Sequence, residues 1–425
     1  MAFNESEWLS EMSTSLLSPH KGRILLFSYA FPPMQVQMTA AVFKPMAAIA
    51  RLGFEVDVLC ADSFSPHLGI DDSLLPFAKE TFGNIIRLNP PTGLIGKLQR
   101  RSRVLSHVPD LMTVLHRSAY EQLMDMDLTK YDAVMTWSPF HSINPVMVRI
   151  KKQRRGVRWL AQFCDPWAGN PLEVSRLTKL WNWWHEPRTL DAADFIVHSS
   201  RYSLDLMLKN HPEYMRKKTD VLHHVFDEEL YPQRPKIKNE KIIIRYVGVL
   251  YGRRSPEPLF QALNQLFQRR KDLEGLLAIE LIGHVPPEML NTSSALSLPE
   301  GTVVSIPSVN YIQSLELMYD ADILLLIDAD VRQNLFLPSK LSDYVGANTP
   351  IVGLVPPGGS EDALKDLGCW YVRPHDIRGI SHAVESAVDY ETNSSPSPWC
   401  NEAYRQTISG KQVGNRFIQI IESVA

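Results

Sequence analysis

The fold class is decided by residues 24–58, whose sequence is ILLFSYAFPPMQVQMTAAVFKPMAAIARLGFEVDV. The apolar run at 24–27 predicts a buried strand, and a turn-rich stretch with two adjacent prolines follows it. Residues 40–51 carry apolar side chains at helical spacing, and Gly53 marks the end of that helix. Phe54, Val56 and Val58 alternate with acidic residues, which predicts a second strand. A strand, a helix and a strand within about 35 residues have the length of a βαβ unit.

The same alternation of strands and helices continues along the chain. Short apolar segments predict strands at 133–137, 159–164, 195–198 and 221–223, and a second series at 242–247, 278–282, 303–306, 323–327, 351–354 and 370–372. Helical patterns separate most of them, which favours parallel sheets covered by helices on both faces. We therefore expect an α/β fold of two Rossmann-like, doubly wound domains that face each other across a cleft.

The chain divides at a polar segment, residues 231–241, whose two prolines and charged run predict a linker. We expect a flexible N-terminal tail at 1–20, a first Rossmann-like domain at 21–230 and a second at 242–402. Val413, Phe417 and Ile420 recur at helical spacing. Residues 403–425 are therefore expected to form a C-terminal helix that packs back towards the first domain.

The composition excludes several classes of protein. The 425 residues carry 44 Lys and Arg against 47 Asp and Glu, a net charge of −3, whereas nucleic-acid-binding domains are usually clearly basic. The four cysteines form no Cys-x-x-Cys pair, which excludes a disulfide scaffold and a cysteine-type zinc site. The chain has no apolar run of the about 18 residues expected of a membrane-spanning helix. Residues 1–20 contain Glu but no Lys or Arg, unlike a signal peptide, so we expect a cytoplasmic protein.

A first candidate site lies at residues 246–259, YVGVLYGRRSPEPL. A strand is expected to end at Gly248, a loop with Arg253 and Arg254 follows, and a helix is expected to start near Ser255. The free amides of a helix start attract an anion, and Arg binds phosphate oxygens in pairs. This segment is neither a dinucleotide-binding fingerprint nor a Walker loop. Taken alone, the segment favours the simpler interpretation of two solvated arginines on a surface loop.

A second candidate site lies at residues 336–351, FLPSKLSDYVGANTPI, between two expected strands. Pro338, Ser339 and Lys340 would begin a helix, where backbone amides and the lysine charge can meet a phosphate. Asp343 lies one turn further along the same face and can accept a hydrogen bond from a sugar hydroxyl. The alternative is a capped helix with an ordinary Lys and Asp on its surface.

These two clusters, with YDADILL at 319–325, resemble the donor half of a GT-B glycosyltransferase, most closely one of glycosyltransferase family 4. Members of that family transfer a sugar from a nucleotide sugar with retention of configuration. The first half is similar to the same group, and the resemblance covers roughly residues 22–425. Its motifs there are FPP at 31–33, VPD at 108–110, SPFHS at 138–142, FCDPW at 163–167, WHE at 184–186 and AAD at 192–194.

The resemblance implies a donor site in the second domain and an acceptor site in the first. Its donor-binding residues would be Gly248, Arg253, Arg254, Pro338, Ser339, Lys340, Leu341 and Asp343. Arg254 and Lys340 would also act in catalysis, because positive charge on the leaving nucleoside diphosphate lowers the barrier without a metal or another cofactor. The partners implied are a nucleotide sugar as co-substrate and a carbohydrate or lipid-linked acceptor, such as a polysaccharide precursor.

Two further catalytic candidates follow strands of the first domain. The resemblance suggests that His141 contacts the donor sugar or the acceptor hydroxyl, and a neutral His can accept a hydrogen bond there. Asp165 can orient an acceptor hydroxyl or accept its proton. The alternatives are a core residue for His141 and a turn residue before Pro166 for Asp165. Basic stretches at 97–103 and 149–158 fit either peripheral contact with anionic lipids at the inner face of a membrane or a solvated surface.

The chain departs from the family pattern at several positions. Leu335 stands where the family has the first Glu of its Glu-x7-Glu motif, with Asp343 at the second position. Val249 replaces the usual Arg, and the loop at 34–39 contains no glycine. These departures leave three alternatives beside a transferase: a catalytically inactive nucleotide-binding partner protein, a phosphorylase and a sugar-nucleotide epimerase.

Overall fold

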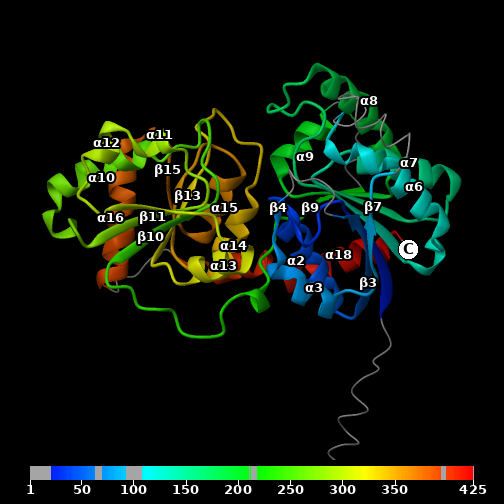
Figure 1. The fold of residues 1–425 in the computed structure, drawn as a ribbon, viewed down its shortest axis with the longest axis horizontal. Coiled ribbons are helices and arrows are strands. Elements are labelled where there is room, and N and C mark those ends of the chain that lie inside the picture. Colours follow the sequence, from blue (N-terminus) through cyan, green and yellow to red (C-terminus); the bar gives the residue numbers. More distant parts are fainter. Residues whose placement is uncertain are drawn as a thin grey trace, which may run out of the picture.

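The computed structural model describes residues 21–62, 69–91, 108–209, 211, 218–393 and 399–424. The tail expected at 1–20 and the basic stretch at 97–103 lie outside these residues. Figure 1 shows two α/β units side by side, each built on a sheet covered by helices. Among the described helices, none combines the length and apolar character needed to cross a membrane.

The first sheet has seven parallel strands in the order β5-β3-β1-β6-β7-β8-β9. Its strands are β1 (Gly22–Phe27), β3 (Phe54–Ala61), β5 (Ile85–Leu88), β6 (Ala133–Ser138), β7 (Trp159–Phe163), β8 (Phe195–His198) and β9 (Thr219–Val221). Helices cover both faces, because parallel strands all begin at the same end of the sheet and the chain must cross back to that end between them. They are α2 (Thr39–Arg51), α3 (Leu75–Thr81), α6 (His116–Asp125), α7 (Ile143–Gln153), α8 (Arg176–Ala192) and α9 (Arg201–Leu208).

The second sheet has six parallel strands in the order β12-β11-β10-β13-β14-β15. Its strands are β10 (Ile242–Val247), β11 (Leu277–Ile282), β12 (Val303–Ile306), β13 (Ile323–Ile327), β14 (Ile351–Leu354) and β15 (Trp370–Val372). Its helices are α10 (Glu257–Arg269), α11 (Pro287–Leu290), α12 (Ser293–Leu296), α13 (Tyr311–Tyr319), α14 (Ser339–Ala347), α15 (Gly359–Leu367) and α16 (Ile377–Asn393). A small antiparallel pair, β2 (Met34–Gln35) and β4 (Gly69–Ile70), lies outside both sheets.

The structure confirms the predicted α/β fold with two Rossmann-like sheets. Five strands of the second sheet have the predicted bounds, and β11 begins one residue earlier, at Leu277. In the first sheet, β9 begins at Thr219, two residues before the predicted start. The edge strand β5 was not predicted, because its four residues include the charged Arg87 and give only a short apolar pattern.

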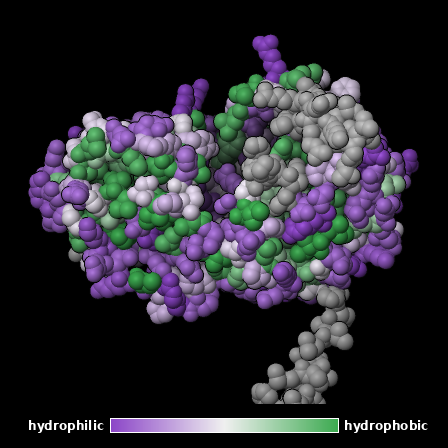
Figure 2. Space-filling view, viewed as in Figure 1, coloured by the Kyte–Doolittle hydropathy of each residue, from purple (hydrophilic) through white to green (hydrophobic). Residues whose placement is uncertain are grey.

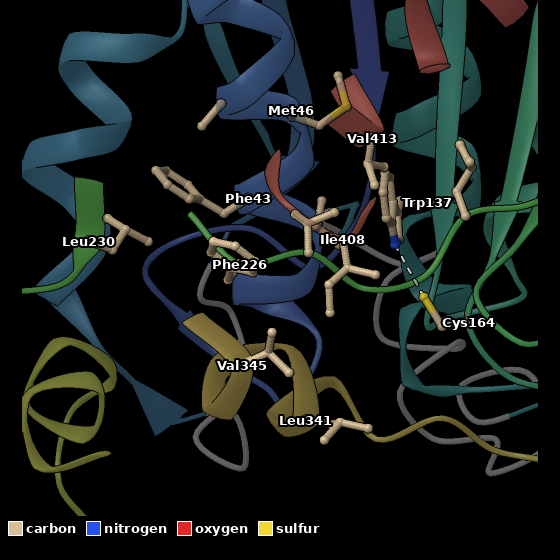
Figure 3. Close-up of a cluster of buried hydrophobic side chains, with 14 of the residues drawn as sticks. Phe43, Met46, Trp137, Cys164, Phe226, Leu230, Leu341, Val345, Ile408 and Val413 are labelled. Carbon is tan, nitrogen blue, oxygen red and sulfur yellow. Dashed lines mark hydrogen bonds between the residues drawn. The ribbon is translucent and has the colours of Figure 1, made fainter. Parts of the chain in front are cut away.

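One apolar cluster contains buried residues of both domains, and Figure 3 shows part of it. Phe226, in the segment that leads to the second sheet, lies among residues of α2, α14 and the C-terminal segment. That segment forms two helices, α17 (Glu402–Thr407) and α18 (Gly410–Ser423), rather than a single one. The backbone N–H of Gly410 donates to the carbonyl of Phe226 at 2.9 Å, and α18 packs on α2. The C-terminal helix therefore returns to the first sheet and holds α2 in place.

Because α18 packs closely on α2, we expect that any side chain introduced at Gly414 lowers the stability of the protein. A Cβ there would lie 3.0 Å from Leu52 Cδ1 and 3.5 Å from Ala48 Cβ, so Gly414→Leu must push the helices apart. We expect a loss of about 1–3 kcal/mol in the free energy of unfolding, measured by urea denaturation. The same side chain at the exposed Gln419 is the control and is expected to change stability by less than about 0.5 kcal/mol. Equal costs at both positions would contradict the packing argument.

Candidate functional site

A cavity of about 540 Å³ lies between the two domains and has a size typical of ligand pockets (Figure 2). The first domain contributes the segment after β1, residues 34–41, together with Lys44 of α2. The second domain contributes the ends of β10 and β11 and the start of α14. The predicted residues that line the cavity are Gly248, Arg254, Ser339, Lys340 and Asp343. The carboxyl ends of the parallel strands therefore place five of the eight predicted donor-binding residues in one wall.

Lys340 forms the cationic centre of this wall. Its Nζ donates a hydrogen bond to Tyr246 Oη at 2.8 Å. A Cβ at Gly248 would come within 2.5 Å of the same Nζ, and the positive φ of Gly248 (141°) also favours glycine. Burial, with Arg254 as a nearby second cation, lowers the pKa of Lys340 from 10.5 to about 7. The free site therefore holds a lysine whose charge is only partly stabilised.

Arg254 lies beside Lys340, and its guanidinium has a hydrogen-bond donor that is not used within the described residues. Its guanidinium is 3.7 Å from the buried carboxylate of Asp328, and it stacks over the Tyr251 ring at 5.3 Å. Arg254 Nε is buried and has no hydrogen-bond partner among the described residues. The nine-residue helix α14 starts at the same wall, and its N-cap, Pro338, provides no side-chain hydrogen bond. Two cations and free backbone N–H groups together suit an anion such as a diphosphate.

The remaining predicted donor residues lie outside the cavity. Arg253 is exposed and does not line it. Pro338 and Leu341 face a small separate space of about 10 Å³ that His224 also lines. In this structure they support α14 rather than the cavity surface. The family resemblance placed them with Ser339 and Lys340 because the four residues form one continuous motif.

Asp343 is already engaged by partners from both domains. Its carboxylate forms an ion pair with Lys44 Nζ and accepts a hydrogen bond from Tyr311 Oη at 2.8 Å. Its backbone carbonyl accepts one from Tyr231 Oη, also at 2.8 Å. The Lys44 side chain is only 1% exposed. The carboxylate expected to bind a sugar hydroxyl therefore also joins α2 of the first domain to α14 of the second.

Lys44, Tyr311 and Gly283 are wall residues that the sequence analysis missed. Lys44 carried a usable signal, because a lysine between Phe43 and Met46 interrupts the apolar face of a buried helix. Gly283 follows β11 as Gly248 follows β10, and their backbones approach too closely for a Cβ at Gly283. Tyr311 carried no local signal, since its role depends on the distant Asp343.

His141 and Asp165 lie on the first-domain side, beyond the cavity lining. His141 follows β6, and its ring stacks on Trp167 with centroids 4.8 Å apart. Burial lowers the pKa of His141 to about 3, so the ring is neutral at pH 7, and its buried Nδ1 has no partner among the described residues. Burial raises the pKa of Asp165, which follows β7, to about 6. Neither residue contacts the Arg254–Lys340 wall in this arrangement of the domains.

Leu335, which stands where the family has its first Glu, has a different role in this protein. The backbone carbonyl of Leu335 accepts hydrogen bonds from Ser200 Oγ and Ser203 Oγ, both at 2.7 Å. These serines belong to the N-terminal turn of α9 in the first domain. Leu335 therefore supplies a backbone contact between the domains and no carboxylate to the site.

The basic stretch at 149–158 makes several intramolecular contacts. The Arg149 guanidinium stacks over the Tyr120 ring at 4.1 Å, and Lys151 forms an ion pair with Asp194 at 2.6 Å. Arg154 donates to the carbonyl of Met126 at 2.6 Å. These three cations make contacts within the first domain, which fits a structural role for this stretch.

Solved structures of known proteins share this fold, whereas no protein-family model and no curated protein sequence matches the chain. A glycosyltransferase from Rickettsia africae has a TM-score of 0.64 at 11% identity, covering 95% of this chain and 99% of its own. Anabaena HepE in complex with UDP and glucose has a TM-score of 0.64 at 13% identity, covering 95% and 100%. The UDP-GlcNAc 2-epimerase from Methanocaldococcus jannaschii has a TM-score of 0.56 at 11% identity, covering 94% and 99%. The chain therefore has the GT-B fold.

The ion pair between the domains predicts a test by mutation. Lys44→Met leaves the Asp343 carboxylate buried without its cation, and we expect a loss of about 3–5 kcal/mol in the free energy of unfolding. The double variant Lys44→Met/Asp343→Asn removes both charges and keeps an acceptor for Tyr311. It should recover at least half of that loss, measured by denaturation of all four proteins in a double-mutant cycle. Simple additivity of the two single effects would show that the pair is not coupled.

Proposed function

We propose that this protein is a glycosyltransferase that moves a sugar from a nucleoside diphosphate sugar to an acceptor hydroxyl, as the family 4 resemblance implies. The observation that carries the proposal is the pair formed by Arg254, in the loop after β10, and Lys340, at the start of α14, which together line a cavity between two domains. The Rickettsia africae protein with this fold is named a glycosyltransferase, another protein with this fold is a sucrose-phosphate synthase, and HepE was solved with UDP and with UDP-glucose. A UDP sugar is therefore the first donor to test.

In this proposal, the diphosphate of the donor lies against Lys340 and Arg254. The bond between the sugar C1 and the diphosphate oxygen breaks, and the two cations and the α14 amides stabilise the negative charge that develops on that oxygen. The acceptor oxygen forms a new bond to C1 on the same face of the sugar, and its proton passes to the leaving phosphate. The resemblance implies this course, and with it retention.

The first domain would hold the acceptor, a carbohydrate or a lipid-linked polysaccharide precursor. Asp165 follows β7 and His141 follows β6. Both therefore lie at the carboxyl ends of the strands, as does the cavity segment 34–41, which follows β1. With a pKa of about 6, Asp165 is mostly ionised at pH 7 and able to orient an acceptor hydroxyl. The neutral His141 would accept a hydrogen bond through Nδ1, which has no partner among the described residues. Both are proposed to position the acceptor.

A second candidate function is nucleotide binding without turnover. It is favoured by Leu335, because the carboxylate that contacts the transferred sugar in the family is missing and its place is used for a contact between the domains. An epimerase is less well supported, although one structure with this fold is named as such. It needs free acidic or basic groups in the cavity, and the lining carboxylates Asp71 and Asp343 already accept hydrogen bonds from other residues.

Ligand binding tests the donor site directly. With UDP-glucose as the probe, we expect saturable stabilisation of the protein and a loss of about 10- to 100-fold in affinity in Arg254→Ala and Lys340→Ala, because each variant removes a charged hydrogen-bond donor. The exposed Lys271, which pairs with Glu274, supplies the matched control Lys271→Ala. Isothermal calorimetry measures the affinities, and release of UDP with an acceptor present measures turnover.

Three outcomes of this experiment are informative. Binding that both variants lose, with turnover, supports the transferase. Binding without turnover on a broad acceptor panel favours the inactive binder. Equal affinity in Lys340→Ala, Arg254→Ala and the control would overturn the donor site.

The pKa of Lys340 predicts how binding depends on pH. Only the protonated ammonium attracts the diphosphate, so affinity for UDP-glucose is expected to fall as pH rises above about 7, by up to tenfold per pH unit. UDP-glucose suits the test because its diphosphate, esterified at both ends, does not itself titrate near pH 7. Lys340→Arg should keep binding constant from pH 6 to pH 9, since Arg stays charged. An equally steep fall in Lys340→Arg would assign the pH dependence to another group.

A further inference from the structure

Helix α8 (Arg176–Ala192) is built with its polar side inward. Its buried side chains are Thr178, Asn182, Glu186, Thr189 and, in the last turn, Leu190, so four of the five are polar. The opposite face is exposed to solvent and mostly apolar, with Leu177, Leu180, Trp183 and Trp184 between 53% and 69% exposed. An amphipathic helix on a soluble protein normally has the reverse arrangement. The outward face of α8 therefore has no apolar partner within the described chain.

Hydrogen bonds fix this orientation. The indole N–H of Trp167 donates to Asn182 Oδ1 at 2.9 Å, and the backbone N–H of Ala168 donates to Glu186 Oε2 at 2.7 Å. Ser175 caps the start of the helix through the N–H of Thr178. A rotation of α8 that buried its tryptophans would leave these buried polar groups without partners. The apolar face is thus held outward by the structure beneath it.

The exposed apolar surface continues into the segment before the helix. Leu172 and Val174 are 67% and 87% exposed, and six of the twelve large hydrophobic residues recorded as exposed in the described chain lie between 172 and 184. Figure 1 places α8 at the upper, outer surface of the first domain, away from the second sheet. A cluster of exposed apolar side chains of this size is typical of an interaction surface.

The charges on this surface are mainly positive. Within residues 172–190, all of which are described, the exposed charged side chains are Arg176, Lys179 and Arg188. Arg188 stacks over the Trp184 ring with its guanidinium carbon 3.6 Å from the ring centroid. Asp191, at the end of the helix, is the nearest exposed acid. Exposed tryptophans and leucines flanked by cations match the chemistry of the boundary between lipid headgroups and acyl chains.

We propose that the outward face of α8, with residues 172–175, docks on an anionic lipid surface. A second copy of the chain fits this face less well, because a two-fold interface would gather Arg176, Lys179 and Arg188 of both copies in one contact. The proposal places the contact on α8 and not on the basic stretches that the sequence suggested. It does not rest on the proposed transferase activity.

Vesicle binding without nucleotide tests this proposal separately from the donor site. The full chain is mixed with equimolar phosphatidylcholine–phosphatidylglycerol vesicles or with pure phosphatidylcholine vesicles, and the bound fraction is measured by sedimentation. We expect binding to the anionic vesicles and at least about tenfold weaker partitioning in Trp183→Ser/Trp184→Ser, because two apolar anchors are lost. Arg176→Gln and Lys179→Gln should each weaken it about fivefold.

Matched variants separate docking from folding. Leu296→Ser removes an apolar side chain of similar exposure (72%) from the second domain and should leave vesicle binding unchanged. Leu180→Glu places a negative charge on the α8 face and should abolish binding while the thermal unfolding curve stays that of the parent. Wild-type protein that sediments with neither vesicle, or a double Trp variant that binds as the wild type does, overturns the proposal. A wild-type dimer that the Trp substitutions dissociate would instead assign the face to a second copy.

Discussion

The ion pair between Lys44 and Asp343 sets the relation between the two halves of the molecule. It joins α2 of the first domain to α14 of the second, and both side chains are almost completely buried. Around it lies the apolar cluster that contains Phe226 and residues of both sheets. A buried pair of this kind tolerates little displacement, because a separated charge would lose its partner in a medium of low polarity. The pair therefore stabilises the arrangement of the two cavity walls that the structure shows.

The charges in the cavity are unequally balanced. The lining carboxylates Asp71 and Asp343 each accept hydrogen bonds from other residues, whereas Arg254 Nε has no hydrogen-bond partner among the described residues. Among the described residues, the hydrogen-bond partner of the Lys340 ammonium is the Tyr246 hydroxyl, and burial beside a second cation lowers the pKa of Lys340. A bound diphosphate would restore the ordinary stability of that charge. The positive charge of Arg254 and Lys340 thus favours an anionic ligand over a neutral sugar. Both residues belong to the second domain.

Local sequence patterns predicted most of the fold and one wall of the site. Strands such as β13 and the start of α14 follow from apolar runs and a Pro-Ser sequence, which are features of neighbouring residues. The partners of Asp343 could not be predicted in this way, since Lys44 lies 299 residues away in the chain. The same limit applies to His141 and Asp165. Their strands were located correctly, but the sequence could not show that they lie beyond the cavity lining.

Helix α8 shows a different limit of sequence reasoning. Its tryptophans are more simply interpreted as core or interface residues, because most large aromatic side chains are buried. In the structure Trp183 and Trp184 are exposed, because the hydrogen bonds of the polar side chains on the opposite face fix the orientation of the helix. The residues that receive those bonds connect α8 to the segment after Asp165, where the acceptor would be positioned. A surface that violates the usual burial rule is therefore linked by a few bonds to the candidate acceptor site, and such violations are expected where function outweighs local stability.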